Sequence, residues 1–120
     1  MGKNNLSGAW GEAIAAQYLQ KKRFTIIATN YRSRFGEIDI IAQNRKFLVF
    51  AEVKTRKSAK FAAASAFVDH YKQERLRTTA ELYLSENPTQ LQPRFDVIEV
   101  YAPEGIDTEK PVINHMEDAF

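Results

Sequence analysis

The strongest guide to the fold is a pair of short segments with the composition of β-strands, residues 37–42 and 47–55. Four polar residues, 43–46, separate them. Two strand-like segments joined by so short a polar connection are typical of an antiparallel hairpin. The second segment is strongly apolar up to residue 51, as expected of a strand that packs against a core.

The hairpin predicts where its charged side chains lie. With a four-residue loop, Asp39 faces Phe50 across the pair. Side chains alternate between the two faces of a strand, so Asp39 then shares a face with Glu52 and Lys54. Asp39 and Glu52 become diagonal neighbours, roughly 7–8 Å apart between Cα atoms. A register change of one residue would move Asp39 to the opposite face, so the prediction depends on the loop length.

The N-terminal segment is expected to form a helix that ends near residue 22, with Asn5 or Ser7 as its cap. The apolar spacing predicts one buried stripe, made of Trp10, Ala13, Ile14 and Tyr18. Glu12 shares a second stripe with Ala16 and Leu19, so its carboxylate is expected to point towards the protein body. There it would need a partner or a metal ion. The alternative is a glutamate that faces solvent.

The remaining segments alternate between strand and helix patterns. Strands are expected over 24–29 and 94–101, with a basic turn at 31–36 after the first. A helix is expected from about 69 to 85, with one apolar face made of Leu76, Ala80, Tyr83 and Leu84. Asn87-Pro88 should end it, and the stretch after residue 101 is weakly patterned. This order predicts a single mixed α/β domain over residues 1–120.

Two carboxylates beside a lysine have a direct chemical use. Carboxylate oxygens suit Mg²⁺, which binds through one or two such groups together with substrate phosphate, and Mn²⁺ is an alternative ion. Such a metal could polarise a phosphodiester, while Lys54 could position a water molecule or stabilise developing charge. The alternative is that Glu52 and Lys54 form a weak exposed ion pair on a strand. The strongly apolar strand before Glu52 favours the metal site.

The motifs Gly36-Glu37-Ile38-Asp39 and Glu52-Val53-Lys54 resemble those of the PD-(D/E)xK nuclease superfamily. More closely, the chain is similar to the YraN family of largely uncharacterised bacterial proteins, which are related in fold to Holliday-junction resolvases. The resemblance covers nearly the whole chain; besides those motifs it includes Gly11-Glu12, Asn30-Tyr31-Arg32, Lys72-Gln73 and Arg94-Phe95-Asp96-Val97. It implies a restriction-endonuclease-like mixed sheet flanked by helices.

The resemblance also implies roles for individual residues. Asp39, Glu52 and Lys54 would be catalytic, and the implied metal ligands are Glu12, Asp39, Glu52 and the Val53 carbonyl. Gln73 would be a supporting residue near the site. The sequence departs from the family pattern at Arg23 and Ala62, where glycine is common. Asp96 is expected to be structural, and His70 and His115 are expected to have no role as ligands.

Charge is distributed unevenly along the chain, although the net charge is only +2. Residues 21–77 carry fourteen basic and five acidic side chains, whereas residues 78–120 carry two basic and nine acidic ones. Basic side chains around an acidic metal site can hold phosphates, and the candidates are Arg32, Arg34, Arg56, Lys57, Lys72 and Arg75. The expected partner is nucleic acid, most simply DNA, contacted through its backbone or its branched shape.

Three functions are consistent with the sequence. The first is a Mg²⁺-dependent nuclease, the second a nucleic-acid-binding module with little or no catalysis, and the third a protein-interaction domain. Cleavage of a junction would favour a two-fold homodimer. The absence of cysteine and of any long apolar run predicts a cytoplasmic protein that does not enter a membrane.

Overall fold

The computed structural model describes residues 2–57 and 69–120 of the chain. In these ranges the order of elements is helix α1 (Gly2–Lys21), strands β1 (Thr25–Ser33), β2 (Gly36–Gln43) and β3 (Phe47–Arg56), helix α3 (His70–Glu86), strand β4 (Gln92–Tyr101), a short 3-10 turn η2 (Gly105–Asp107) and strand β5 (Val112–Met116). Ala62, one of the two positions where the sequence departs from the family pattern, lies outside the described residues. Neither described helix is long and apolar enough to cross a membrane.

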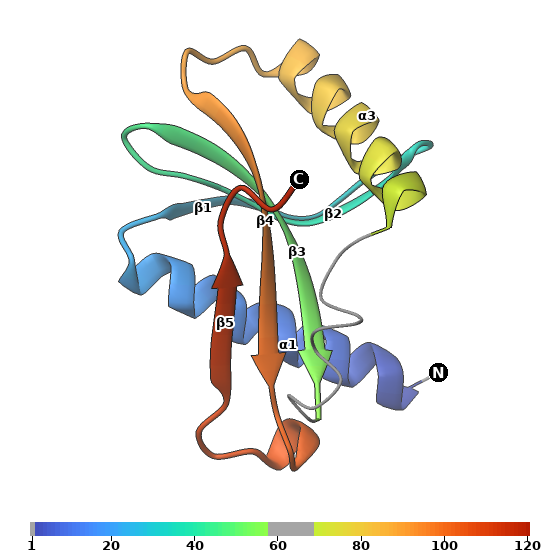
Figure 1. Ribbon diagram of the computed structural model, residues 1–120, viewed down its shortest axis with the longest axis vertical. Helices are drawn as coiled ribbons and strands as arrows, with labels where there is room; N and C mark the ends of the chain where they lie inside the picture. The colour runs from blue at the N-terminus through green and yellow to red at the C-terminus, as the bar shows by residue number, and fades with distance from the viewer. Residues whose placement is uncertain (1, 58–68) are drawn as a thin grey trace.

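The five strands form one mixed sheet in the order β1-β2-β3-β4-β5. Strand β3 pairs in parallel with β4, and the other neighbouring strands pair antiparallel. Figure 1 shows α1 crossing one side of the sheet and α3 lying beside β2 on the other. The described structure is therefore a small α/β fold with a five-stranded mixed sheet and two helices, as the α/β prediction required.

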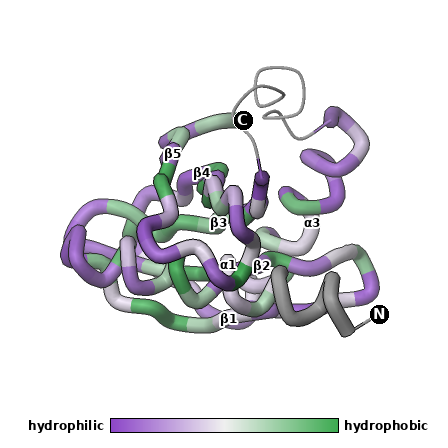
Figure 2. The backbone as a smooth tube through the Cα atoms, turned by 90° about the horizontal axis from the view of Figure 1, so that it is seen from below, coloured by the Kyte–Doolittle hydropathy of each residue, from purple (hydrophilic) through white to green (hydrophobic). Residues whose placement is uncertain are grey.

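Each helix covers its own apolar cluster, because neighbouring strand residues point to opposite faces. Val49 and Ile98 pack with Ala15 and Leu19 of α1. On the other face, one cluster contains Ile38, Ile41, Leu48, Phe50, Leu76, Ala80 and Val97. Figure 2 shows the hydrophobic stretches of β3 and β4 in the middle of the molecule. The predicted apolar face of the second helix is confirmed, since Tyr83 and Leu84 also pack against this cluster.

The predicted stripe of α1 was wrong at Ala13, which is exposed, and its other members are only half-buried. The buried positions are Gly11, Ala15 and Leu19, one helical turn apart. A Cβ atom on Gly11 would overlap the Thr55 hydroxyl oxygen. Small side chains thus let the helix approach β3 closely, which a search for large apolar residues does not detect.

The hairpin loop was also predicted too long. Gln43 pairs with Leu48, and the Asn44 amide donates to the Phe47 carbonyl at 3.0 Å. The Asn44 side chain accepts from the Lys46 and Phe47 amides, so residues 45 and 46 alone make the turn. The register therefore differs by two residues from the prediction. Because the side-chain period of a strand is two, the expected faces are unchanged.

Three further differences concern the backbone. Strand β1 extends into the predicted basic turn and ends at Ser33. Strand β5 forms in the weakly patterned C-terminal region. Helix α1 begins at Gly2, before the expected caps. Arg23, one of the two departures from the family pattern, adopts a φ of 72° just after α1 ends. Glycine adopts this left-handed conformation at lower cost than arginine.

Candidate metal and phosphate site

The candidate site lies where β2 and β3 stop pairing. The last pair in their ladder is Ile40 with Ala51. Beyond it the Val53 amide donates to the Asp39 carboxylate at 2.8 Å, so a side chain replaces the strand backbone as the partner. Figure 1 shows β2 turning away from β3 beside α3. This divergence opens the sheet edge beside Asp39.

The same divergence exposes a backbone oxygen towards the site. On an antiparallel strand, the N–H and C=O of one residue point to the same neighbouring strand. Since the Val53 N–H reaches Asp39, the Val53 carbonyl points to the same side. Asp39 and Glu52 line one cavity, and the Val53 carbonyl lies on the Asp39 side of β3 beside it.

Glu52 is buried on β3, with 7% of its surface exposed. Its Oε1 atom accepts from the Lys72 Nζ atom at 2.8 Å. Lys72 stands in the first turn of α3, which Asp69 caps by accepting from the Lys72 amide at 2.8 Å. The cap fixes the start of the helix over the acid pair.

The surroundings of Asp39 disfavour its ionised form. Burial is the main cause that raises the pKa of Asp39 to about 7, and the Glu52 charge adds to it. The hydrogen bond from the Val53 amide acts in the opposite direction but does not compensate. A carboxylate in this state would gain from a nearby cation, because opposite charge favours the ionised form.

Glu12 and Lys54 have perturbed pKa values at the same place. Burial raises the pKa of Glu12, with a lowering contribution from a hydrogen bond to Asn30 and a raising one from Glu52. Burial lowers the pKa of Lys54, and the charge of Lys72 lowers it further. Burial thus acts on both groups in the direction that disfavours charge. Such shifts are frequent at functional sites.

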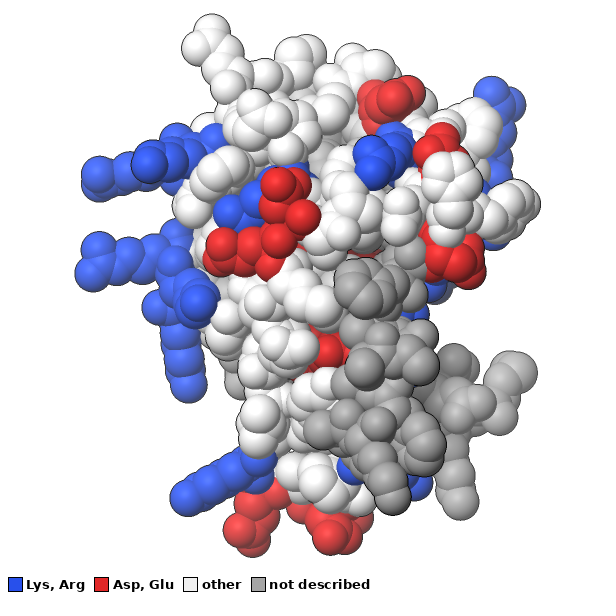
Figure 3. Space-filling view, in the orientation of Figure 1, with Lys and Arg blue, Asp and Glu red and all other residues white. Residues whose placement is uncertain are grey.

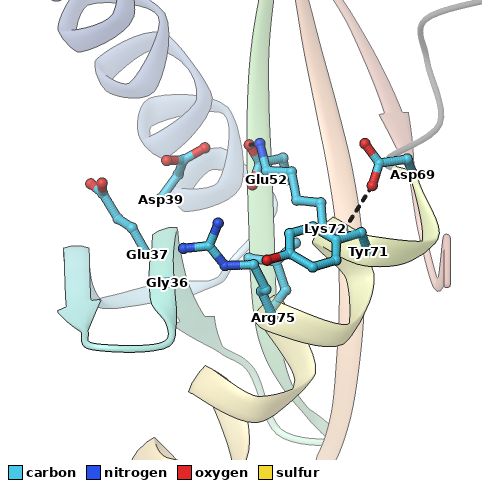
Figure 4. A pocket seen from close by; sticks show the side chains of 9 residues that line it. Gly36, Glu37, Asp39, Glu52, Asp69, Tyr71, Lys72 and Arg75 are labelled. Atoms are coloured by element: carbon cyan, nitrogen blue, oxygen red, sulfur yellow. Dashed lines mark hydrogen bonds and ion pairs between the residues drawn. The ribbon is translucent and has the colours of Figure 1, made fainter.

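Two cavities meet at Asp39. The first has a volume of about 430 Å³ and is lined by Gly36, Glu37, Asp39, Glu52, Asp69, Tyr71, Lys72, Arg75 and Leu76. Figure 4 shows its side chains, with Glu37 and Asp39 on one side and Lys72, Tyr71 and Arg75 of α3 on the other. The second has about 370 Å³ and is lined by Gly8, Ala9, Glu12, Asn30, Arg32, Glu37 and Asp39. Asp39 therefore links the α3 side to Glu12 of α1.

The cations predicted from the sequence are divided by the fold. Lys72 and Arg75 line the first cavity, and Arg32 lines the second. Arg34 is exposed and its guanidinium lies 4.9 Å from the Phe35 ring centre. Arg56 lies 3.9 Å from the fully buried Glu99. Lys57, directly after β3, is exposed.

The remaining predicted residue, Gln73, is half-buried on α3. Glu37 was missed, although it precedes Asp39 by two positions on a strand, a spacing that could have indicated a shared face. In the part of the chain that the structure describes, no three His, Asp or Glu side chains form a cluster able to hold a metal ion. The ligand role of Glu12 therefore stays a prediction.

Comparison with known proteins gives a family match. The model of the family described as "Uncharacterised protein family UPF0102" matches residues 11–100, a range that contains Asp39 and Glu52. A UPF0102 protein of Caldanaerobacter subterraneus is 48% identical, over 94% of this chain and 93% of the relative. One of Alkaliphilus oremlandii is 45% identical, over 98% and 99%. One of Flavobacterium psychrophilum is 39% identical, over 100% and 98%.

Proposed function

We propose, on the premise that this chain belongs to the uncharacterised protein family UPF0102, that it is a metal-dependent nuclease. The membership confirms the family resemblance in the sequence, and the family description assigns no activity. The proposal therefore depends on the site. As part of it, we assign the sheet with a helix on each face to the restriction-endonuclease-like class.

The observation that carries the proposal is the state of Asp39. A half-buried carboxylate whose pKa is raised to about 7, beside the buried carboxylate of Glu52, is a costly arrangement for the fold alone. The Val53 carbonyl, on the same side of β3 as the Val53 amide that binds Asp39, would add a third oxygen. Hard oxygen donors of this kind fit Mg²⁺ or Mn²⁺, which keep several waters and need few protein ligands. The residues present therefore fit a divalent cation, with Asp39, Glu52 and the Val53 carbonyl as ligands, and Glu12 lines the cavity on the other side of Asp39.

Bound at this position, Mg²⁺ would polarise a phosphodiester and lower the pKa of a water molecule. The chain's own residues have separate tasks. Asp39 and Glu52 hold the ion, while Lys54 orients the attacking water or donates to the phosphate oxygen that gains charge. Burial already lowers the pKa of Lys54, which suits a lysine that exchanges a proton. Lys72 and Arg75 hold the neighbouring phosphates across the cavity.

Nucleic acid is the substrate class that the surface charge supports. A second groove, far along β3 from Glu52, is lined by Lys22, Arg23, Asn44, Arg45 and Lys46. Figure 3 shows Lys and Arg side chains projecting together along the edge where α1 ends. Cations at two separate places on the surface favour a long polyanion, whose binding weakens steeply with salt. We propose DNA as the simplest such substrate.

A binding module with little catalysis is the second candidate, and one contact favours it. The Lys72 ammonium forms an ion pair with the Glu52 carboxylate at 2.8 Å, so a metal ion would have to displace it. If that ion pair persists in the presence of Mg²⁺, the site would hold phosphate without cleaving it.

Labelled single-stranded, duplex, flapped and four-way-junction DNA, incubated with Mg²⁺, Mn²⁺ or EDTA, would separate the two candidates. The nuclease proposal predicts metal-dependent cleavage that falls at least about 100-fold in Asp39→Asn and Glu52→Gln. These near-isosteric changes preserve shape, and Val112→Ala at the far sheet edge serves as a control. Salt-sensitive binding without any cleavage would contradict the nuclease proposal and favour the binding module.

A further inference from the structure

The rim of the first cavity carries an exposed aromatic side chain. Tyr71, in the first turn of α3, has 73% of its surface exposed, the largest fraction among the exposed large apolar residues of the described ranges. Val112 and Ile106 are exposed too, but neither lines the cavity that contains Asp39 and Glu52. Single exposed apolar residues are common on proteins, so position is what distinguishes Tyr71.

Tyr71 also borders a second, shallower groove. This groove, of about 140 Å³, is lined by Phe35, Tyr71, Glu74, Arg75 and Thr78. It adjoins the first cavity, since Tyr71 and Arg75 line both. An aromatic ring at the junction can contact a ligand whose phosphate lies beside the carboxylates.

The surrounding charges suit a nucleotide. The Arg75 guanidinium lies 5.9 Å from the Tyr71 ring centre, and its Nε donates to the Phe35 carbonyl at 2.9 Å. That bond holds the start of α3 against the turn between β1 and β2. Arg34 lies over the Phe35 ring at 4.9 Å. Glu74 is the one acid that lines the shallower groove. Two arginines beside two aromatic rings offer both phosphate contacts and stacking surfaces.

We propose that Tyr71 and Phe35, together with Arg34 and Arg75, bind an unpaired nucleobase and its phosphate next to the acid pair. This deepens the proposed function and rests on it for the identity of the cleaved bond. Bases inside a duplex have no free face, so a stacking site on the cavity rim selects a single-stranded, flapped or extruded nucleotide. The substrate class is therefore DNA with an unpaired nucleotide beside the scissile phosphodiester.

The test measures binding in EDTA, and in Ca²⁺ in place of Mg²⁺, so that its result does not depend on cleavage. A duplex with a flap carries 2-aminopurine at the unpaired position next to the junction, and the matched duplex carries it fully paired. We expect wild-type protein to quench the unpaired probe and to prefer the flap about tenfold. Tyr71→Ala should lose the quenching and weaken flap binding about tenfold, with little change for the paired duplex.

Variants distinguish stacking from a general loss of surface. Tyr71→Phe should restore quenching and affinity, whereas Tyr71→Leu, which keeps apolar area without a ring, should not. Val112→Ala should behave as wild type. Unchanged quenching in Tyr71→Ala, equal affinity for both duplexes, or no binding by the wild type would overturn the inference. Failure of the nuclease proposal has a different signature: the Tyr71 effect on binding persists, but no substrate is cleaved in Mg²⁺.

Discussion

Asp96 and Asp39 are carboxylates on the two strands that flank β3, but their surroundings differ. Asp96 is fully buried, and Arg94 donates to both of its oxygens, at 2.9 and 2.8 Å. The His115 Nε2 atom lies 2.7 Å away, and the Asp118 amide donates at 3.0 Å. Burial acts to raise the pKa of Asp96, but these hydrogen bonds outweigh it and hold the pKa below its usual value.

Asp39 has no comparable set of partners among the contacts recorded in the described residues. It accepts from the Val53 amide, and its pKa is raised to about 7 mainly by burial and then by Glu52. The contrast separates two uses of an acid that the fold removes from water, wholly for Asp96 and in part for Asp39. Where the fold supplies matching donors, the acid joins β4 to β5 and the C-terminal segment; where it does not, the acid is available to a cation from solution.

The largest expected effect is on stability at Asp96. Asp96→Asn removes the charge that balances the buried Arg94 guanidinium, so we expect the free energy of unfolding at pH 7 to fall by about 3–5 kcal/mol. Urea denaturation measures this value. As the control, Arg32→Met breaks an exposed pair with Glu37 and should cost less than about 1 kcal/mol. A loss at Asp96 no larger than the control would contradict the structural role.

Asp39→Asn should raise the free energy of unfolding, whereas Asp96→Asn should lower it. In metal-free buffer the folded protein binds a proton at Asp39 up to about pH 7, whereas the unfolded chain releases it near 3.8. In the wild type, the contribution of Asp39 to the free energy of unfolding is thus fully present below pH 3.8 and is lost as the pH rises to 7. The variant should be more stable by roughly 2–3 kcal/mol at pH 8, because a tenfold change in proton affinity corresponds to about 1.4 kcal/mol and solvent reduces the total.

Urea denaturation of both proteins from pH 4 to 8 measures the difference and cancels the titration of other carboxylates. The advantage of the variant should grow across this range and level off above pH 7. A difference that does not change with pH would show that Asp39 is ionised at no cost to the fold.

The hairpin and α1 show what the sequence can predict. The face shared by Asp39 and Glu52 followed from the period of two, and it survived a two-residue error in register because that error is even. The turn itself depends on two side-chain hydrogen bonds of Asn44, which composition does not specify. A tight turn at Arg45 and Lys46 and a longer polar loop look alike in sequence.

Contacts between distant segments were the harder part. The pairing of Lys72 with Glu52 depends on where α3 begins, and the cap at Asp69 sets that point. Strand β5 has only five residues, and it forms because the edge of β4 is available to pair with it. The stripe of α1 was misjudged since close packing at Gly11 depends on Thr55, forty-four positions away.

Mg²⁺ should distinguish the two acids by ligand-linked stability. At a Mg²⁺ concentration ten times the dissociation constant, the wild type should gain about 1.4 kcal/mol at pH 7.5, because only the folded site binds the ion. Asp39→Asn should gain little. Thermal unfolding with Mg²⁺ or with EDTA, at matched ionic strength, measures the shift. An equal shift in both proteins would indicate a general salt effect instead.

The smallest effect is expected at Lys72. Its side chain is 44% exposed, so Lys72→Met should change the free energy of unfolding by less than about 1 kcal/mol. Removing the ammonium should nevertheless tighten Mg²⁺ binding a few-fold, because Mg²⁺ then no longer competes with Lys72 for the Glu52 carboxylate. Calorimetric titration of Mg²⁺ into both proteins checks this. Weaker Mg²⁺ binding in the variant would mean that Lys72 helps to form the metal site.

The most direct test of a cation site at the acid pair is a count of bound Mn²⁺. Electron paramagnetic resonance of free Mn²⁺ during titration gives the number of ions bound by wild type and by the Asp39→Asn, Glu52→Gln double variant. We expect one ion per wild-type chain at this site, displaced by Mg²⁺, and none in a folded double variant. Equal Mn²⁺ binding by the two proteins, or none by either, would contradict the assignment of Asp39 and Glu52 as metal ligands.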